Sequence, residues 1–157
     1  MPPISAILHT SNDARTLGRA LESLRSCDEM LVMDHGSSDD THKIAREYGA
    51  RVEPASSPQD SGAVHAAHDW ILCVLPSEAL SESLEASILE WKQEGPGEAA
   101  AYALALRTET VDGWTHSPPE VRLVHRRKLR WTGALPPNTG DALSLCGDLL
   151  RFRDPAG

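Results

Sequence analysis

Apolar and polar positions in the first 95 residues follow two alternating periods. Short apolar runs typical of buried strands lie at 4–8, 30–33 and 69–75, and 51–53 is predicted to be a further short strand. Apolar residues at helical spacing lie in three intervening or following segments, at 17–24, 44–48 and 84–91. Strands alternating with helices in this way imply βαβ units with right-handed crossovers. The predicted fold class is therefore α/β with a largely parallel sheet.

Polar residues and glycines mark the ends of the three predicted helices. The segment 10–13 (Thr-Ser-Asn-Asp) supplies capping residues for the first helix. Ser37 and Asp40 have capping-box spacing before the second helix, and Gly49 is suited to end it. Ser81 is expected to cap the third helix, which ends near residue 95.

The second half of the chain has a different pattern, dominated by strands. Residues 100–111 alternate as a strand does, 120–125 and 128–131 are predicted to form a hairpin, and 143–152 suggests another strand. The segment 54–62 is a loop by composition. The chain shows no internal repeat.

Length and composition favour one acidic domain with a substantial core. The chain has 157 residues, 40% of them hydrophobic, and its net charge is 15 minus 23, or -8. This charge argues against nucleic acid as a partner, because binding to phosphates requires clustered Lys and Arg. Cys27, Cys73 and Cys146 form no metal or disulfide pattern and are interpreted as buried free thiols. With no basic leader and no long apolar run, we expect a cytoplasmic protein, and peripheral membrane contact stays open.

The predicted sheet brings three strand ends together, and open α/β sheets bind ligands at the carboxyl ends of their strands. These ends are His9-Thr10, Asp34-His35 and the segment 75–78. Thr10 and Asn12 could hydrogen-bond a base or ribose, although Asn12 and the serines after Gly36 could equally be helix caps. Asp34 could accept from a ribose hydroxyl or a base N–H. A carboxylate directly after an apolar run favours such a function over packing.

Residues 4–52, ISAILHTSNDARTLGRALESLRSCDEMLVMDHGSSDDTHKIAREYGARV, resemble the nucleotide-binding half of the family 2 glycosyltransferases. The similarity is strongest to the bacterial branch that includes lipopolysaccharide-core glucosyltransferases. That branch continues with a dWvLflDADE segment, to which DWILCVLPSE at 69–78 corresponds. Residues 121–133, VRLVHRRKLRWTG, are similar to the RLFRRgkaRfeG segment of the same branch.

This resemblance implies a GT-A, nucleotide-diphosphosugar transferase-like fold, with a mostly parallel Rossmann-like sheet and helices on both faces. One domain would fill 1–157, with a nucleotide-binding half at 1–75 and an acceptor-side half at 76–157. The implied activity is sugar transfer from a nucleotide-sugar donor, most simply of the UDP type, to an acceptor. Thr10 matches the first family motif and Asp34 matches the aspartate that holds the base or ribose. Asn12 and Gly36 complete the expected nucleotide site.

Two departures from the family pattern concern the chemistry. In the family, acids at the first and third positions of DADE bring Mg²⁺ or Mn²⁺ to the diphosphate. Leu75 and Ser77 stand at these positions, so no metal site and no cofactor are expected, and Glu78 alone matches the acidic end. Where the family often places a His-Glu pair, this chain has Leu-Pro-Pro at 135–137, and the nearest acid is Asp141. Glu78 and Asp141 are therefore the candidate catalytic acids.

Three functional readings follow from these departures. The protein could be a transferase that uses Arg or Lys in place of the metal. It could instead be a pseudo-enzyme that binds a nucleotide without turnover, or an interaction scaffold. A homo-oligomer is compatible with each reading.

Other residues allow a functional and a structural interpretation. His35, His65 and His68 could form a transition-metal site, but two nearby histidines without a clear third ligand are usually coincidence. A basic cluster is either a solvated hairpin or a surface for diphosphate, a phosphorylated acceptor or anionic lipid. Its members are Arg122, His125, Arg126, Arg127, Lys128 and Arg130, of which Arg122 and Arg126 are the candidates for the diphosphate or acceptor side. Trp114 and Trp131 could stack on a sugar, but are expected to fill the core.

Overall fold

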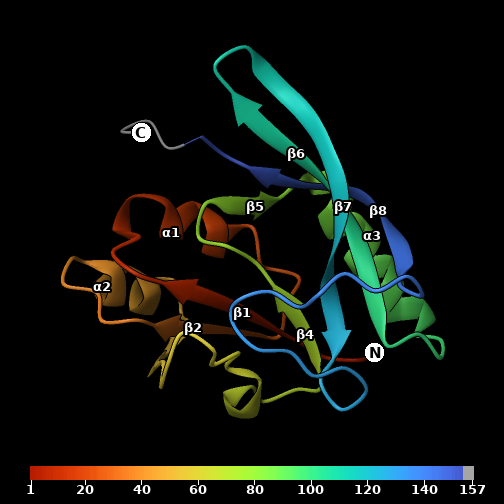
Figure 1. The fold of residues 1–157 in the computed structure, drawn as a ribbon, viewed down its shortest axis with the longest axis horizontal. Helices are drawn as coiled ribbons and strands as arrows, with labels where there is room; N and C mark the ends of the chain where they lie inside the picture. The colour runs from red at the N-terminus through yellow and green to blue at the C-terminus, as the bar shows by residue number, and fades with distance from the viewer. Residues whose placement is uncertain (154–157) are drawn as a thin grey trace.

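The computed structural model describes residues 1–153 and shows one eight-stranded sheet that takes strands from both halves of the chain (Figure 1). The strands are β1 (Ile4–Thr10), β2 (Glu29–Asp34), β3 (Arg51–Pro54), β4 (Trp70–Cys73), β5 (Glu78–Leu80), β6 (Ala101–Thr110), β7 (Gly113–His125) and β8 (Leu143–Arg151). The helices are α1 (Ala14–Glu22), α2 (Thr41–Glu47), α3 (Glu82–Glu94) and the 3₁₀ turn η1 (Ala63–His65). The strand order is β3-β2-β1-β4-β7-β6-β8-β5.

The first half forms the parallel part of the sheet, as the sequence predicts. β1 pairs in parallel with β2 and with β4, and β2 pairs in parallel with β3. The register places Thr10 opposite Asp34, so the carboxyl ends of β1 and β2 lie side by side. The α/β class is confirmed, and the carboxyl ends of β1 and β2, which the sequence singled out, lie at the same end of the sheet.

Alternate residues of each central strand point to two separate cores. In β1, Ile4, Ala6 and Leu8 belong to one cluster, whereas Ile7 belongs to the other. The buried hydrophobic residues of α1, α2 and α3 all belong to the first cluster. The second is covered by loop residues, including Trp131. The three α-helices thus lie over one face of the sheet, whereas the sequence predicted helices on both faces. The difference arises because the long connections before β4 and after β7 occupy the other face.

Gly62 shows how closely the loop before η1 approaches the second face. Its φ is +80°, and a Cβ on this residue would stand 2.6 Å from Cγ of Met33. Only glycine combines this backbone conformation with so close an approach. The loop is therefore fitted to the sheet that it covers.

The hairpin predicted at 120–125 and 128–131 is wrong. Instead, β6 pairs with β7 as a long antiparallel hairpin, and residues 128–131 form no strand. The turn lies at Val111 and Asp112, and Gly113, with φ +121°, is the first residue of β7 and pairs with Thr110. Two prolines at 118–119 hid the strand, since proline is rare inside a sheet. The register shifts between Leu104 and Leu106, opposite these prolines, which accommodates them as a bulge.

The helix caps follow the sequence only in part. The Ser81 hydroxyl accepts a hydrogen bond from the Leu84 N–H at 3.2 Å, which confirms the predicted cap of α3. Asp13 and Asp40 stand at the N-caps of α1 and α2 without a side-chain cap bond. None of the helices in residues 1–153 is long and apolar enough to cross a membrane.

The three cysteines are free, but they differ in burial. Cys73 is buried, Cys27 is partly buried and Cys146 is exposed, so the prediction of buried thiols is wrong for Cys146. Burial raises the pKa of the Cys73 thiol to about 12. Cys73 is therefore a neutral core residue.

Candidate functional site

Asp34 is the centre of a buried hydrogen-bond cluster at the carboxyl ends of β1 and β2. Its Oδ1 accepts from the Thr10 hydroxyl at 2.7 Å and from the Ser37 hydroxyl at 2.5 Å. Its Oδ2 accepts from the Ser37 N–H at 2.9 Å and lies 2.8 Å from Nε2 of His42. The structure thus joins Thr10 and Asp34, as the sequence predicts, and adds Ser37 and His42.

These donors keep Asp34 ionised. Burial acts to raise the pKa of this carboxyl, but hydrogen bonds from Ser37, His42 and Thr10 outweigh it and hold the pKa well below its usual range. The residue is only 5% exposed. The Asp34 carboxylate is therefore a fixed negative charge at the carboxyl ends of β1 and β2.

Asn12 and Gly36, the other expected nucleotide residues, shape the loops around this cluster. Asn12 has φ +57°, and its side-chain Oδ1 accepts from the Ser38 N–H at 2.8 Å. Its backbone N–H donates to the Ser37 hydroxyl at 2.8 Å. Asn12 thus ties the loop after β1 to the loop after β2. Gly36 has φ +81° and open space around its Cα, so the backbone there is accessible.

A pocket of about 420 Å³ opens beside Asp34. It is lined by Asp34, Gly36, Ser37, His42, Arg46, Val52 and Pro54. Three polar residues of the cluster, Asp34, Ser37 and His42, therefore line one pocket between α2 and the ends of β2 and β3. Its size is that of a small-molecule site.

Two histidines flank the same strand ends. Nδ1 of His9 lies 2.8 Å from Nε2 of His35, and Nε2 of His9 lies 3.1 Å from the Ser61 carbonyl oxygen. Burial lowers the pKa of His9. His35 thus pairs with His9, whereas the metal-site hypothesis required His65 and His68. Within residues 1–153 no three His, Cys, Asp or Glu side chains are grouped to hold a metal ion, so that hypothesis is wrong.

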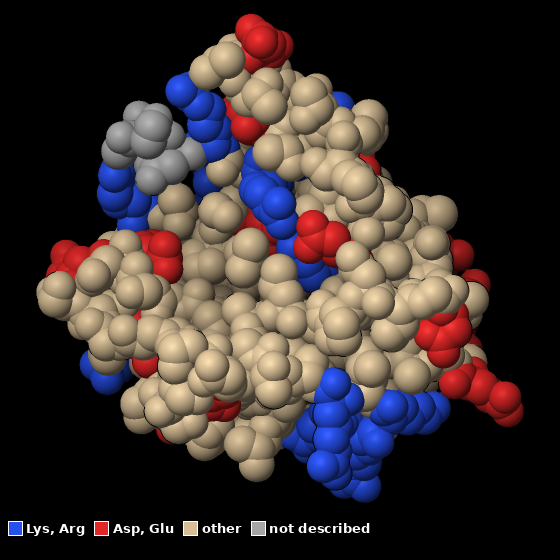
Figure 2. Space-filling model, in the orientation of Figure 1, with Lys and Arg blue, Asp and Glu red and all other residues tan. Residues whose placement is uncertain are grey.

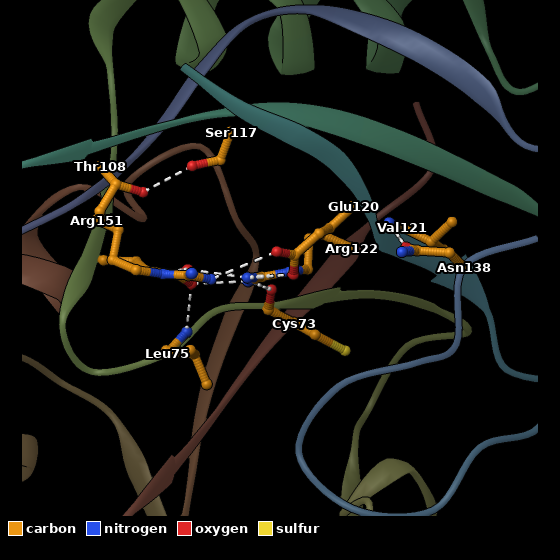
Figure 3. Close-up of polar contacts among 10 residues, drawn as sticks. Cys73, Leu75, Thr108, Ser117, Glu120, Val121, Arg122, Asn138 and Arg151 are labelled. Atoms are coloured by element: carbon orange, nitrogen blue, oxygen red, sulfur yellow. Dashed lines mark hydrogen bonds and ion pairs between the residues drawn. The ribbon is translucent and has the colours of Figure 1, made fainter. Parts of the chain in front are cut away.

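Glu78 is buried at the end of the neighbouring loop and is held by two arginines. Arg122 donates from Nη1 to Oε1 at 2.7 Å and from Nη2 to Oε2 at 2.8 Å. Arg151 donates from Nη2 to Oε2 at 2.9 Å, and the Leu75 N–H donates to Oε1 at 2.8 Å. Figure 3 shows the side chains of Arg122 and Arg151 pointing toward one another from β7 and β8.

The side chain of Arg122 is as deeply buried as that of Glu78. Glu78 and Arg122 both have fully buried side chains, and Arg122 also donates to Glu120 at 3.0 Å and to the Cys73 carbonyl oxygen at 3.1 Å. The sequence placed Arg122 on the diphosphate or acceptor side and Glu78 among the catalytic acids. In the structure they form a bidentate buried ion pair that joins the start of β5 to β7.

The residues at the end of β4 do not fit a divalent cation. Leucine offers no oxygen ligand from its side chain at position 75, and Ser77 offers only a neutral hydroxyl. The oxygens of Glu78, the nearest carboxylate, are already occupied by arginine and backbone donors. A hard cation would find no free carboxylate there.

Arg126 lies at the end of the sheet opposite to Asp34, beside the amino ends of the parallel strands. The antiparallel pairing of β4 with β7 sets Trp70 opposite His125, so Arg126 follows β7 beside the amino end of β4. Its Nε donates to Asp69 at 2.9 Å and its Nη1 to the Ala63 carbonyl oxygen at 2.8 Å. Figure 2 shows Lys and Arg side chains gathered at this lower edge, where β7 ends in Figure 1.

The remaining candidates are dispersed. Asp141 is exposed in the loop before β8, and its side chain makes no hydrogen bond or ion pair within residues 1–153. Trp131 packs against the second core cluster, as expected, whereas Trp114 is 40% exposed and contacts Phe152 edge to face. The prediction that Trp114 fills the core is therefore wrong.

Sequence reasoning missed four contributors to the two clusters: Ser37 and His42 around Asp34, and Glu120 and Arg151 around Glu78. Ser37 was interpreted only as a capping residue. His42 carries a recognisable signal, because it lies at the start of the helix that follows the strand end. Arg151 has no such signal, since its approach to Glu78 depends on the pairing of β5 with β8, and β5 itself was not predicted.

No protein-family model matches the chain. Among curated proteins, an uncharacterized glycosyltransferase of Rickettsia felis is 38% identical over 97 residues, which cover 56% of this chain and 33% of that protein. The lipopolysaccharide core biosynthesis glycosyltransferase LpsC of Rhizobium meliloti is 26% identical over 96% of this chain and 63% of its own length. The chain thus spans about a third of the length of the Rickettsia relatives that it matches.

Solved structures show the same fold. Mannosyl-3-phosphoglycerate synthase from Rubrobacter xylanophilus superposes with a TM-score of 0.55 and 22% identity, over 71% of this chain and 42% of that one. S. aureus TarS 1-349 gives a TM-score of 0.53 and 20% identity, over 74% of this chain and 38% of that one. The expected resemblance to glycosyltransferases and their GT-A-type fold is confirmed.

Proposed function

We propose that this chain binds a nucleotide-sugar, of UDP type, at the carboxyl ends of β1 and β2, and acts there as a glycosyltransferase-like protein. The observation that carries the proposal is the Thr10–Asp34 pair, which lies beside a pocket of about 420 Å³ at the end of two parallel strands. Ligands of open α/β sheets bind at such strand ends. Thr10, Asn12, Asp34 and Gly36 are the proposed nucleotide residues, and the cytoplasmic location expected from the sequence is part of the same proposal.

The geometry suggests how Asp34 would accept a ligand. All of its hydrogen bonds come from within the chain, and His42 is the donor whose side chain is most open to solvent, at 45% exposure. A base N–H or ribose hydroxyl that replaces the His42 ring would restore the lost hydrogen bond to Oδ2. The ligand would then occupy the volume that His42 now borders.

The same proposal includes no metal chelation by the residues that follow β4. Glu78 is neutralised by Arg122 and Arg151, and Leu75 and Ser77 stand where the family has acids. Binding would therefore proceed without a requirement for Mg²⁺ or Mn²⁺.

Nucleotide binding without turnover is the second candidate. It is favoured by the state of the two expected catalytic acids, since Glu78 is buried in an ion-pair cluster and Asp141 is exposed in a loop. Neither is arranged as a general base facing the Asp34 pocket. Assays of sugar transfer and of donor hydrolysis divide this candidate from an active transferase.

Thermal-shift measurements with UDP, GDP, dTDP and their sugars, each with Mn²⁺ or with EDTA, test the proposal. A ligand at a hundredfold excess over its Kd stabilises the folded state by ~2.7 kcal/mol, which raises Tm measurably. We expect the same shift with Mn²⁺ and with EDTA, its loss in Asp34→Ala, and no change in Asp112→Ala, an exposed acid on the β6–β7 turn. Absence of a shift with every ligand, or a shift that requires Mn²⁺, would contradict the proposal.

A further inference from the structure

A second and larger pocket, of about 620 Å³, lies between η1 and the segment that follows β7. It is lined by Ser61, Ala63, Val64, Arg126, Arg127, Arg130 and Trp131. Three of these seven side chains are guanidinium groups and none is acidic. In a chain of net charge -8, this pocket concentrates positive charge.

The basic pocket is separate from the Asp34 pocket. β4 runs antiparallel to β7, so the end of β7 lies at the amino end of β4, whereas Asp34 lies at the carboxyl ends of β1 and β2. The two pockets share no lining residue. Figure 2 shows a group of Lys and Arg side chains at the lower edge of the molecule, on the side where β7 ends in Figure 1.

The three arginines differ in how firmly they are held. Arg126 is fixed by Asp69 and by the carbonyl oxygens of Ala63 and Ala66, at 2.8 and 2.7 Å for the latter two. Arg127 is 75% exposed and has one ion pair, with Asp69 at 3.3 Å. Arg130 makes no ion pair or hydrogen bond with any other side chain of residues 1–153. Asp69 thus offsets one positive charge, and two remain.

Trp131 and Val64 add an apolar wall to the pocket. Val64 is 83% exposed, whereas the indole Nε1 of Trp131 is buried and has no hydrogen-bond partner in the described part of the chain. Guanidinium groups are complementary to a phosphate, and the Val64 and Trp131 side chains are complementary to a carbon skeleton.

We propose that the basic pocket binds a phosphate-bearing ligand, with Arg127 and Arg130 on the phosphate and the carbon skeleton against Val64 and Trp131. Arg126 is held in place before binding, which lowers the entropy lost when the ligand arrives. A soluble phosphorylated compound and a phospholipid headgroup share this chemistry. The proposal does not depend on nucleotide binding at Asp34.

Calorimetric titration of the full chain with inorganic pyrophosphate tests the charge requirement. We expect saturable binding that weakens with salt, and at least about a tenfold loss of affinity in Arg127→Ala/Arg130→Ala, because hydrogen bonds to charged groups are the strong ones. Arg25→Ala is the matched control, since Arg25 is 72% exposed with one ion pair, to Glu85 at 3.6 Å. The affinity of Arg25→Ala for pyrophosphate should equal that of the wild type.

Nuclear magnetic resonance locates the bound probe. The chain has four tryptophans, so its indole N–H signals are few, and Trp131→Phe identifies the one of interest. Pyrophosphate should shift the Trp131 signal in the wild type and in Asp34→Ala alike. The Asp34→Ala result separates this proposal from that for the nucleotide.

Co-sedimentation with phosphatidylcholine vesicles, with and without phosphatidylglycerol, identifies the source of the phosphate. Binding that needs both phosphatidylglycerol and the two arginines indicates a headgroup. Pyrophosphate binding without vesicle binding indicates a soluble ligand. If neither probe binds, or if Arg127→Ala/Arg130→Ala binds as the wild type does, the proposal is wrong.

Discussion

Asp34 and Glu78 are both buried acids near the carboxyl ends of central strands, but they are held by different kinds of donor. Asp34 is held by hydroxyl, backbone and imidazole donors from Thr10, Ser37 and His42. Glu78 is held by two guanidinium groups. The first acid keeps a net charge next to a pocket, whereas the charge of the second is cancelled inside the protein.

The contrast shows that a buried acid at a strand end can have one of two roles, in ligand binding or in stabilising the fold. An ionised carboxylate held by hydroxyl, backbone and imidazole donors can exchange one of them for a ligand donor without breaking a buried guanidinium pair. A carboxylate in a fully buried bidentate ion pair cannot release its partner without leaving a charge unpaired in a low-dielectric interior. The donors of Asp34 therefore suit the binding role that we propose for it, whereas those of Glu78 suit a structural role.

The largest test of this contrast removes the fully buried one of the two arginine partners of Glu78. Arg122→Met should destabilise the fold by about 3–5 kcal/mol, because it leaves the buried Glu78 charge with the partly exposed Arg151 as its remaining arginine partner. Urea unfolding followed by circular dichroism measures the loss. The double variant Glu78→Leu/Arg122→Met should recover most of it, since neither charge is then left unpaired. A loss below about 1 kcal/mol for the single variant would mean that the ion pair is not structural.

A smaller loss is expected when the acid of the first cluster is removed. Asp34→Ala leaves the Thr10 and Ser37 donors without their acceptor and should destabilise by about 1–3 kcal/mol in the same urea assay. Thr10→Val, which removes one donor and keeps the acid, should have the smaller effect of the two. The reverse order would show that the hydroxyl is the more important member of the pair.

Acid unfolding separates the contribution of the Asp34 charge. The folded-state pKa of Asp34 lies below its unfolded value of about 3.9, so its stabilisation is complete above about pH 5 and decreases as the pH falls through the folded value. The free energy of unfolding of the wild type should therefore decrease between about pH 5 and pH 2. Asp34→Asn should flatten this decrease; an unchanged slope would assign it to other carboxylates.

His42→Ala should have the smallest effect, about 0.5–1.5 kcal/mol, since a half-exposed hydrogen bond contributes little net stability. Asp34 retains its other donors in this variant. If His42 is the donor that a nucleotide displaces, His42→Ala should keep the UDP-induced thermal shift that Asp34→Ala loses. Loss of the shift in both variants would make His42 a ligand contact.

The sequence predicted what depends on local pattern and failed where pairing is non-local. The parallel strands and α3 with its Ser81 cap follow from periodicity and capping chemistry. The meeting of Thr10 with Asp34 follows from the parallel order of β1 and β2. The role of Arg122 was not predictable, because its side chain is buried only through the β4–β7 pairing and through a β5 strand of three residues. The prolines at 118–119 likewise concealed most of β7, whose bulge compensates for them.

The unequal covering of the two sheet faces has a consequence for amide exchange. One face is covered by three helices, whose backbone amides are protected by regular hydrogen bonds, and the other by loops that depend on scattered contacts such as the Arg126 bonds to Ala63 and Ala66. Segments with few regular hydrogen bonds open locally, at a free energy below that of global unfolding. Deuterium should therefore enter residues 55–68 and 129–142 well before α3. The loop-covered face, which borders the basic pocket, would be the side from which the sheet first becomes accessible.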